Sequence, residues 1–196
     1  MPVKKMGAML ALLWLIGSGV RVPHCMAETY MFGGSNAEVR FTYEVGLVSQ
    51  TARFKEVAGL CEFDEMALDR GHIEAVIKTA SLTASTPFIE DKLKGEDFFN
   101  VAVWPEIRFK SRAVRPAGGN KAELAGDLTM NGVTRLVTMR VAFRKAGRSG
   151  QTPALSSPRL TATARIRRSS FNMTALSFLV GDEIDIELDA VLRKKQ

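Results

Sequence analysis

Apolar and polar residues alternate along several stretches of this chain, most regularly at residues 39–45 and 184–190. Both stretches place an apolar side chain at every second position and a charged or hydroxyl-bearing side chain between. Strict alternation is typical of a β-strand with one buried face, because successive side chains point to opposite faces of a sheet. Weaker patterns of the same kind predict further strands at 54–63, 73–78, 107–113 and 160–166.

Two more strands are predicted at 124–130 and 133–141, on either side of Asn131-Gly132. An Asn-Gly pair between alternating runs indicates a hairpin, because a type I′ turn needs positive φ at both central residues. The chain is therefore expected to contain about eight strands joined by short polar turns. Antiparallel strands with one apolar face indicate an all-β domain, built as a barrel or as a sandwich.

One segment between the third and fourth predicted strands has a different spacing. Phe88, Ile89 and Leu93 follow Thr86-Pro87 at helical intervals, and Gly95 ends the pattern. We therefore expect a short helical insert at this point. The apolar residues on and after it are placed to cap one mouth of a barrel: Phe88, Leu93, Phe98 and Phe99.

The first 27 residues have the three parts of a secretory signal peptide. A positive start at Lys4-Lys5 is followed by a short apolar core at 9–16 and a small-x-small cleavage site at 25–27. A membrane-spanning helix needs about 20 apolar residues, which is more than this run contains. We therefore expect a signal peptide at 1–27 and one mature domain at 28–196.

Cleavage changes the charge of the chain. The 196 residues carry 27 Lys and Arg against 21 Asp and Glu, and this net charge of +6 hints at an anionic partner. Residues 1–27 hold three of the basic residues and none of the acidic ones, which leaves 24 basic residues and a net charge of +3.

The remaining basic residues, Arg168 among them, are concentrated in the second half of the chain. Alternation places Arg165 and Arg167 on an outer strand face. No aromatic residues are interleaved with them, so we expect no nucleic-acid partner. Two interpretations stay open: a solvated outer face, or a patch in transient contact with an anionic membrane surface.

Few residues of the mature chain are suited to catalysis or to metal binding. Its one histidine, His72, follows Arg70-Gly71 in a predicted turn, where a solvated side chain is expected. One histidine and one cysteine do not make a zinc ligand set. We therefore expect a protein that is not an enzyme and binds no metal, with Cys61 buried as a small apolar residue.

Several segments match, in order, the motifs of a known family. The most specific are the block from Leu93 to Ser111, which contains Trp104-Pro105-Glu106-Ile107-Arg108-Phe109, and the hairpin Leu128-Thr129-Met130-Asn131-Gly132-Val133-Thr134. Val39-Arg40-Phe41, residues 54–64 and the run from Arg168 to Met173 match further motifs. On these segments, residues 30–192 resemble the YceI-like family of periplasmic lipid- and polyisoprenoid-binding proteins. The family's opening His-Ser is replaced by Asn36-Ala37, and the Asp-Phe-Gly of its last loop by Ser170-Phe171-Asn172.

The resemblance implies an antiparallel eight-stranded lipocalin-like barrel with the short helical insert between strands three and four. It implies a periplasmic, non-catalytic carrier that sequesters a long-chain polyisoprenoid, or a similar lipid such as a polyprenyl quinone, without a further cofactor. The loss of His-Ser puts in doubt any ligand contact that the family makes there. The candidate ligand-binding residues are the large apolar residues of the wall and the cap: Phe41, Tyr43, Phe63, Phe88, Leu93, Phe98, Phe99, Phe109, Leu128, Met139, Phe171, Met173, Phe178 and Ile186.

Two other functions stay open from the sequence. One is a lipid-metabolising enzyme or an accessory of lipid modification, in which His72 or Ser170 would act. The other is an interaction module whose barrel is filled by its own side chains. A homodimer is compatible with the sequence, which does not determine the oligomeric state.

Overall fold

Several long strands bury about every second side chain, as alternation in the sequence predicts. β8 (Lys121–Met130) is the clearest case, since Ala122, Leu124 and Leu128 are buried between exposed or half-buried neighbours. The computed structural model describes residues 28–63, 68–144 and 157–195. The predicted signal peptide at 1–27 lies outside the described residues.

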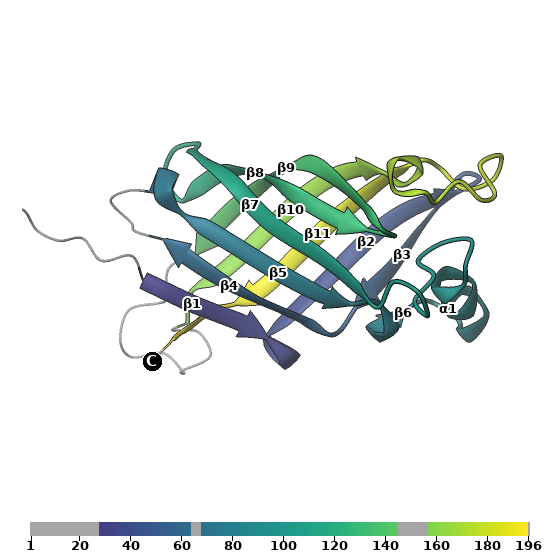
Figure 1. Cartoon of the computed structure of the whole chain (residues 1–196), viewed down its shortest axis with the longest axis horizontal. Helices are drawn as coiled ribbons and strands as arrows, with labels where there is room; N and C mark the ends of the chain where they lie inside the picture. Colours follow the sequence, from purple (N-terminus) through teal and green to yellow (C-terminus); the bar gives the residue numbers. More distant parts are fainter. Residues whose placement is uncertain (1–27, 64–67, 145–156, 196) are drawn as a thin grey trace, which may run out of the picture.

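The described residues form one antiparallel sheet of twelve strands with one inserted helix. The hydrogen-bonded order is β12-β1-β4-β5-β7-β8-β9-β10-β11-β2-β3-β6. The sheet curls about the long axis of the molecule, so that its concave face encloses the core (Figure 1). The elements are β1 (Glu28–Gly33), β2 (Ala37–Val45), β3 (Val48–Phe54), β4 (Val57–Phe63), β5 (His72–Lys78), β6 (Leu82–Thr83), α1 (Pro87–Lys94), β7 (Glu106–Pro116), β8 (Lys121–Met130), β9 (Val133–Arg144), β10 (Arg159–Arg167), β11 (Glu183–Val191) and β12 (Arg193–Lys194).

The predicted all-β antiparallel class is confirmed, but the predicted number of eight strands is wrong. The predicted strand at 54–63 is the end of β3, a turn at Lys55-Glu56 and the whole of β4. The first half of β3 is exposed or half-buried on both faces, so no alternation marks it in the sequence. β6 and β12 pair through two residues each, which is too short for any pattern.

The helical insert is confirmed between the strands predicted at 73–78 and 107–113. The Thr86 hydroxyl caps α1 by accepting a hydrogen bond from the Ile89 N–H at 3.3 Å, and Pro87 takes the first helical turn. The Gly95 N–H donates to the carbonyl oxygens of Asp91 and Lys92 at 3.0 and 3.2 Å and ends the helix. The insert thus begins and ends where its capping residues predict.

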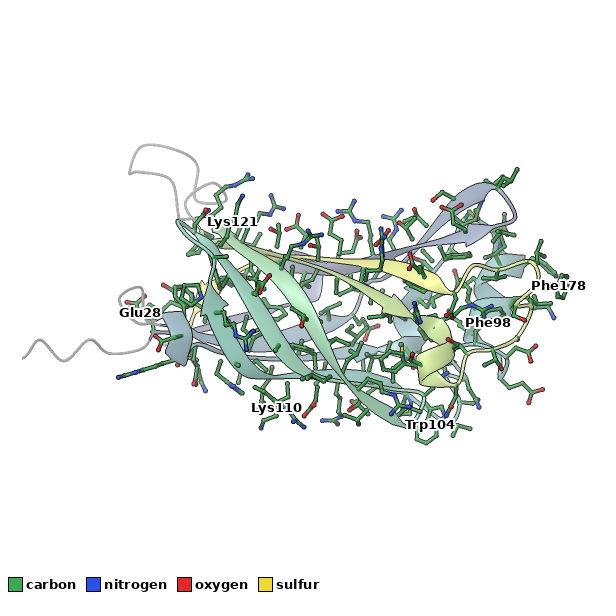
Figure 2. All side chains as sticks on the ribbon, turned by 90° about the horizontal axis from the view of Figure 1, so that it is seen from above. Glu28, Phe98, Trp104, Lys110, Lys121 and Phe178 are labelled. Atoms are coloured by element: carbon green, nitrogen blue, oxygen red, sulfur yellow. The ribbon has the colours of Figure 1, made fainter. Side chains whose placement is uncertain are left out.

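Three segments distant in sequence gather at one end of the long axis. They are α1, the turn between β2 and β3, and the segment 172–182 that connects the short helix η5 (Arg168–Phe171) to β11 (Figure 1). Glu28 and Lys121 lie at the opposite end, as Figure 2 shows. We call the first end the capped end, because it carries the inserted helix.

Candidate functional site: an apolar cavity beneath the capped end

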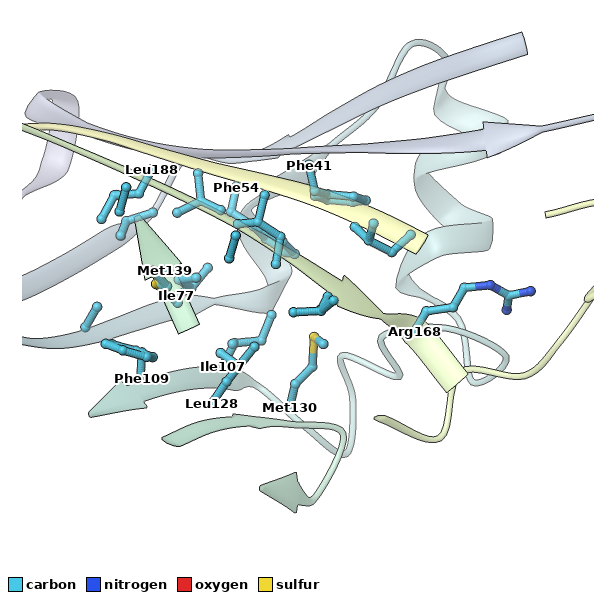
Figure 3. A pocket seen from close by; sticks show the side chains of 18 of the residues that line it. Phe41, Phe54, Ile77, Ile107, Phe109, Leu128, Met130, Met139, Arg168 and Leu188 are labelled. Atoms are coloured by element: carbon cyan, nitrogen blue, oxygen red, sulfur yellow. The ribbon is translucent and has the colours of Figure 1, made fainter. Parts of the chain in front are cut away.

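The concave face of the sheet encloses a cavity of about 110 Å³ (Figure 3). Its wall comes from nine strands and from the segments around α1 and η5. Apolar side chains make nearly all of this wall, and Tyr43 and Arg168 are the polar residues among the lining. The lining consists of Val39, Phe41, Tyr43, Phe54, Val57, Ile73, Ala75, Ile77, Leu93, Phe98, Phe99, Ile107, Phe109, Leu124, Leu128, Met130, Met139, Leu160, Ala162, Ala164, Ile166, Arg168, Met173, Val180, Ile184, Ile186 and Leu188.

The segment after α1 closes part of the cavity. Backbone hydrogen bonds from Phe99 N–H to the Leu93 carbonyl (3.0 Å) and from Asn100 N–H to the Gly95 carbonyl (2.8 Å) fold the chain back on the helix. The Phe99 ring then packs edge-on against the rings of Phe41 and Phe54, with centroids 5.4 and 5.2 Å apart. This aromatic cluster joins the insert to the barrel wall.

Arg168 organises the segment 172–182. Although the sequence places it among the basic residues of an outer face, it is 3% exposed. Its Nε donates to the Gly181 carbonyl at 3.0 Å, Nη1 to the carbonyls of Met173 and Ala175 at 2.7 and 2.8 Å, and Nη2 to the Val180 carbonyl at 2.9 Å. Figure 3 shows its guanidinium directed away from the apolar side chains of the cavity. Only its hydrocarbon stem is therefore suited to line the wall.

Burial lowers the pKa of Arg168, and the nearby Asp182 carboxylate partly opposes that shift. The pKa of Asp182 is itself lowered, chiefly because its carboxylate accepts a hydrogen bond from the Ser169 N–H. The Ser169 hydroxyl donates to the same carboxylate at 2.9 Å. Arg168 and Asp182 thus hold the two ends of the segment 172–182 in place beside the cavity.

Ten of the fourteen candidate residues come together around the cavity. Strand periodicity placed the wall residues, because inward positions repeat every second residue. The ten are Phe41, Tyr43, Leu93, Phe98, Phe99, Phe109, Leu128, Met139, Met173 and Ile186.

The other four candidates lie elsewhere. Phe63 packs between Tyr30 and Phe143, with ring centroids 5.0 and 4.9 Å away, outside the cavity. Phe171 is buried in η5 but does not line the cavity. Phe88 and Phe178 are 71% and 87% exposed, because α1 and the segment 172–182 turn these side chains outward.

Several lining residues were missed by the sequence reasoning. Ile107, Met130 and Leu188 occupy the same inward register as the candidates Phe109, Leu128 and Ile186, so extending the alternation would have found them. Phe54 lies at the end of a strand that the pattern did not separate from the next. Arg168 carries no sequence signal for burial, since its four carbonyl partners come from a segment without periodicity.

Burial raises the pKa of the Tyr43 hydroxyl in the cavity wall, so the phenol stays neutral at ordinary pH. A neutral phenol can donate a hydrogen bond to a polar end group of a ligand.

The His72 side chain is 37% exposed, and it also has partners that the sequence did not indicate. Its Nε2 lies 3.0 Å from Glu74 Oε1, and its Nδ1 lies 3.1 Å from the Ser111 hydroxyl. Hydrogen bonds from Lys110 first, and from His72 second, lower the pKa of Glu74. The Ser111 hydroxyl also accepts a hydrogen bond from the Ile73 N–H at 2.9 Å. The group joins β5 to β7, and neither His72 nor Ser111 lines the cavity.

The outer arginines of β10 are paired with acidic residues of β11. Arg165 contacts Asp185 at 2.7 Å, and Arg159 contacts Asp189 at the same distance. The hydrogen bond to Asp185 raises the pKa of Arg165. Much of the positive charge on this face is therefore balanced locally.

An all-β curled sheet with an apolar interior and a short helical insert defines the lipocalin-like class of folds. Within that class, the sequence profile of the YceI-like domain matches residues 30–192, and this chain belongs to that family.

Sequence relatives agree with this assignment. A UPF0312 protein of Shewanella denitrificans is 30% identical over 130 residues, which cover 64% of this chain and 68% of that protein. A UPF0312 protein of Pseudomonas savastanoi pv. phaseolicola is 34% identical over 95 residues, which cover 48% of this chain and half of that protein.

Solved structures share the fold. Burkholderia cenocepacia BcnA matches with a TM-score of 0.70 and 26% identity, over 80% of this chain and 96% of that one. A polyisoprenoid binding domain from Saccharophagus degradans matches with a TM-score of 0.63 and 11% identity, over 85% of this chain and 98% of that one.

Proposed function

We propose that this protein binds a long-chain polyisoprenoid, or a similar lipid such as a polyprenyl quinone, in the apolar cavity and carries it without chemical change. The observation that carries the proposal is the cavity wall, which is apolar over nearly its whole extent. The solved polyisoprenoid binding domain of the same fold supports this ligand class. The signal peptide expected at 1–27 supports a periplasmic place of action.

The side chains of the wall bear on how such a ligand would bind. Met130, Met139 and Met173 line the cavity, and methionine side chains rearrange at low cost. The wall is therefore suited to opening along the path of a flexible chain.

Energetics also favour a carrier. Each CH₂ group that moves from water into the cavity gains about 0.8 kcal/mol, but a group that moves from a bilayer gains little. Binding relative to a membrane is then modest, which permits both uptake and release. The ligand occupies the cavity as cargo, and the proposed role includes no cofactor.

The catalytic alternative named His72 or Ser170, but Ser170 lies in η5 and the serine that contacts His72 is Ser111. The group that could act is therefore His72, Ser111 and Glu74. This group lies outside the cavity lining, and its serine hydroxyl also accepts a backbone hydrogen bond between strands. A structural role in joining β5 to β7 accounts for all of these contacts. We therefore favour binding without catalysis.

The test is extraction of the purified protein with organic solvent, followed by mass spectrometry and by titration with a polyprenol and a polyprenyl quinone. We expect co-purified lipid and saturable uptake with one site per chain. The double variant His72→Ala/Ser111→Ala should bind as the wild type does. If the wild type converts either probe to a product and this variant does not, the protein is an enzyme. If the wild type carries no lipid and takes up neither probe, the remaining hypothesis is an interaction module with a filled barrel.

A further inference from the structure

Two turns lie side by side at the capped end. The Gly46 N–H donates to the Leu179 carbonyl at 2.8 Å, and the Gly181 N–H donates to the Glu44 carbonyl at 2.9 Å. Val45 and Val180 form an isolated antiparallel bridge between these two hydrogen bonds. The β2–β3 turn and the segment 172–182 therefore project together from the molecule.

Both turns end in exposed apolar side chains. Leu47 is fully exposed at 100%, and Phe178 is 87% exposed. Figure 2 shows Phe178 at the extreme of the long axis, opposite Glu28. Val48, Leu176 and Leu179 are exposed around them, and we call these five residues the apolar tip.

The composition of the two turns is unusual for solvent-exposed loops. Residues 45–52 and 171–181 contain no charged residue, although 24% of the chain is charged. Exposed turns generally favour Gly, Asn, Asp, Ser and Pro, and projecting Leu and Phe side chains at such positions mark interaction sites. The backbone of Leu176 has a φ of 52°, which is unfavourable for leucine. Hydrogen bonds from the N–H groups of Leu179 and Val180 to the Leu176 carbonyl, at 2.9 and 2.8 Å, stabilise this conformation.

The apolar tip is continuous with the cavity. Met173 and Val180 belong to the same segment as Phe178, and both are buried and line the cavity. Arg168 fixes the carbonyl groups of these two residues through Nη1 and Nη2. The segment 172–182 thus has one side against the cavity and the other side bearing the tip.

We propose that the apolar tip inserts into the surface of a lipid bilayer, and that the ligand passes between the membrane and the cavity beneath the segment 172–182. The membrane contact rests on the tip itself, whereas the passage of ligand rests on the proposed function. The tip consists of two narrow uncharged turns, whereas a protein partner with an interface of ordinary size would need a broad complementary surface. A fluid apolar layer needs no such surface, so a bilayer is the better match for the tip. A polyisoprenoid is also a ligand that resides in the bilayer.

The charges around the tip do not select anionic lipids. Glu44 and Asp182 lie next to the two turns, together with Arg167, so both signs are present. The outer arginines of β10 are already paired with β11. Binding through the tip should therefore depend little on anionic lipid or on ionic strength.

The test uses the purified protein and two kinds of vesicle. Flotation with phosphatidylcholine vesicles, with and without phosphatidylglycerol, measures partitioning of the wild type and of Leu47→Ser/Phe178→Ser. We expect the double variant to partition at least about tenfold less, since tenfold corresponds to about 1.4 kcal/mol and two large apolar groups are removed. Met31→Ser, which removes a 42% exposed apolar side chain from β1, is the matched control and should change partitioning less than about twofold.

A second measurement separates docking from ligand binding. A polyprenol delivered from solvent should bind the double variant normally, whereas its transfer from vesicles should be slower by the same factor as partitioning. If the wild type binds no polyprenol, both the proposed function and the proposed passage of ligand are contradicted. Partitioning that depends on the tip would still support docking to the membrane.

Three results would overturn the docking proposal. The first is equal partitioning of the wild type and the double variant. The second is partitioning that requires phosphatidylglycerol and is lost at high salt. The third is a wild-type dimer, seen in sedimentation, that the double substitution converts to a monomer. The last result would identify the tip as a contact between two copies of the chain.

Discussion

At the scale of single residues, the Asn-Gly pair at 131–132 predicted the backbone conformation of its turn but not the tertiary contact that the turn makes. The two residues have φ values of 48° and 72°, as the predicted type I′ turn requires. The same glycine has a second role, since a Cβ at Gly132 would lie 2.6 Å from Cη2 of the Trp104 ring. The contact with Trp104 joins residues 28 positions apart, and no local pattern indicates it.

Gly132→Ala should therefore destabilise the fold more than Gly119→Ala does. Both glycines have positive φ, at 72° and 57°, but a Cβ at Gly119 would meet no atom within 4 Å. We expect about 1 kcal/mol for Gly119→Ala from backbone strain, and about 1–2 kcal/mol more for Gly132→Ala because the indole must move. Urea unfolding gives both values, and equal losses would mean that the Trp104 contact contributes nothing.

Cys61 illustrates a residue that composition alone placed correctly. It was predicted to be buried as a small apolar residue, and its exposed fraction is 0%. Burial, with a smaller effect from Glu62, raises the pKa of its thiol to about 12. The thiol is therefore unreactive at neutral pH, because the thiolate is the nucleophile.

At the scale of elements, hydrogen-bond partners decide where segments without periodicity lie. α1 was predicted from the helical spacing of Phe88, Ile89 and Leu93, and its capping residues act on their own neighbours. The segment 172–182 depends instead on one buried guanidinium and four carbonyl groups. Periodicity could not reveal this, because a loop that is held by a single side chain has no repeating pattern.

Arg168→Met should loosen the segment 172–182, since the carbonyl groups would lose their donors. We expect a loss of about 3 kcal/mol or more in the free energy of unfolding, and faster proteolysis within the segment. Arg165→Met is the matched control, because Arg165 is 61% exposed and its ion pair with Asp185 should contribute less than about 1 kcal/mol. Similar losses for the two variants would contradict a structural role specific to Arg168.

At the scale of the whole molecule, curling of the sheet converts separate apolar strand faces into one enclosed wall. Ala162 of β10 and Phe109 of β7 lie on strands separated in the sheet by β8 and β9, yet both line the cavity. The cavity exists because small and large side chains meet across this interior without filling it.

Filling the cavity should abolish ligand uptake while the fold persists. Ala162→Phe adds a ring to the cavity wall, and we expect polyprenol affinity to fall at least about tenfold, with a stability cost of about 1–3 kcal/mol from overpacking. Ala142→Phe, on the neighbouring strand β9 and outside the lining, adds the same bulk and should leave affinity unchanged. Unchanged affinity in folded Ala162→Phe, judged by circular dichroism and titration, would place the ligand elsewhere.

The sequence by itself determined the all-β class, the inward register of the long strands, the capped helix and the Asn131-Gly132 turn. These features depend on alternation and on neighbouring residues, so they can be read locally. Tertiary structure decided the number of strands, the burial of Arg168, the partners of His72 and the outward turn of Phe88 and Phe178. Each of these depends on contacts between residues distant in sequence, and the curl of the sheet brings those residues together.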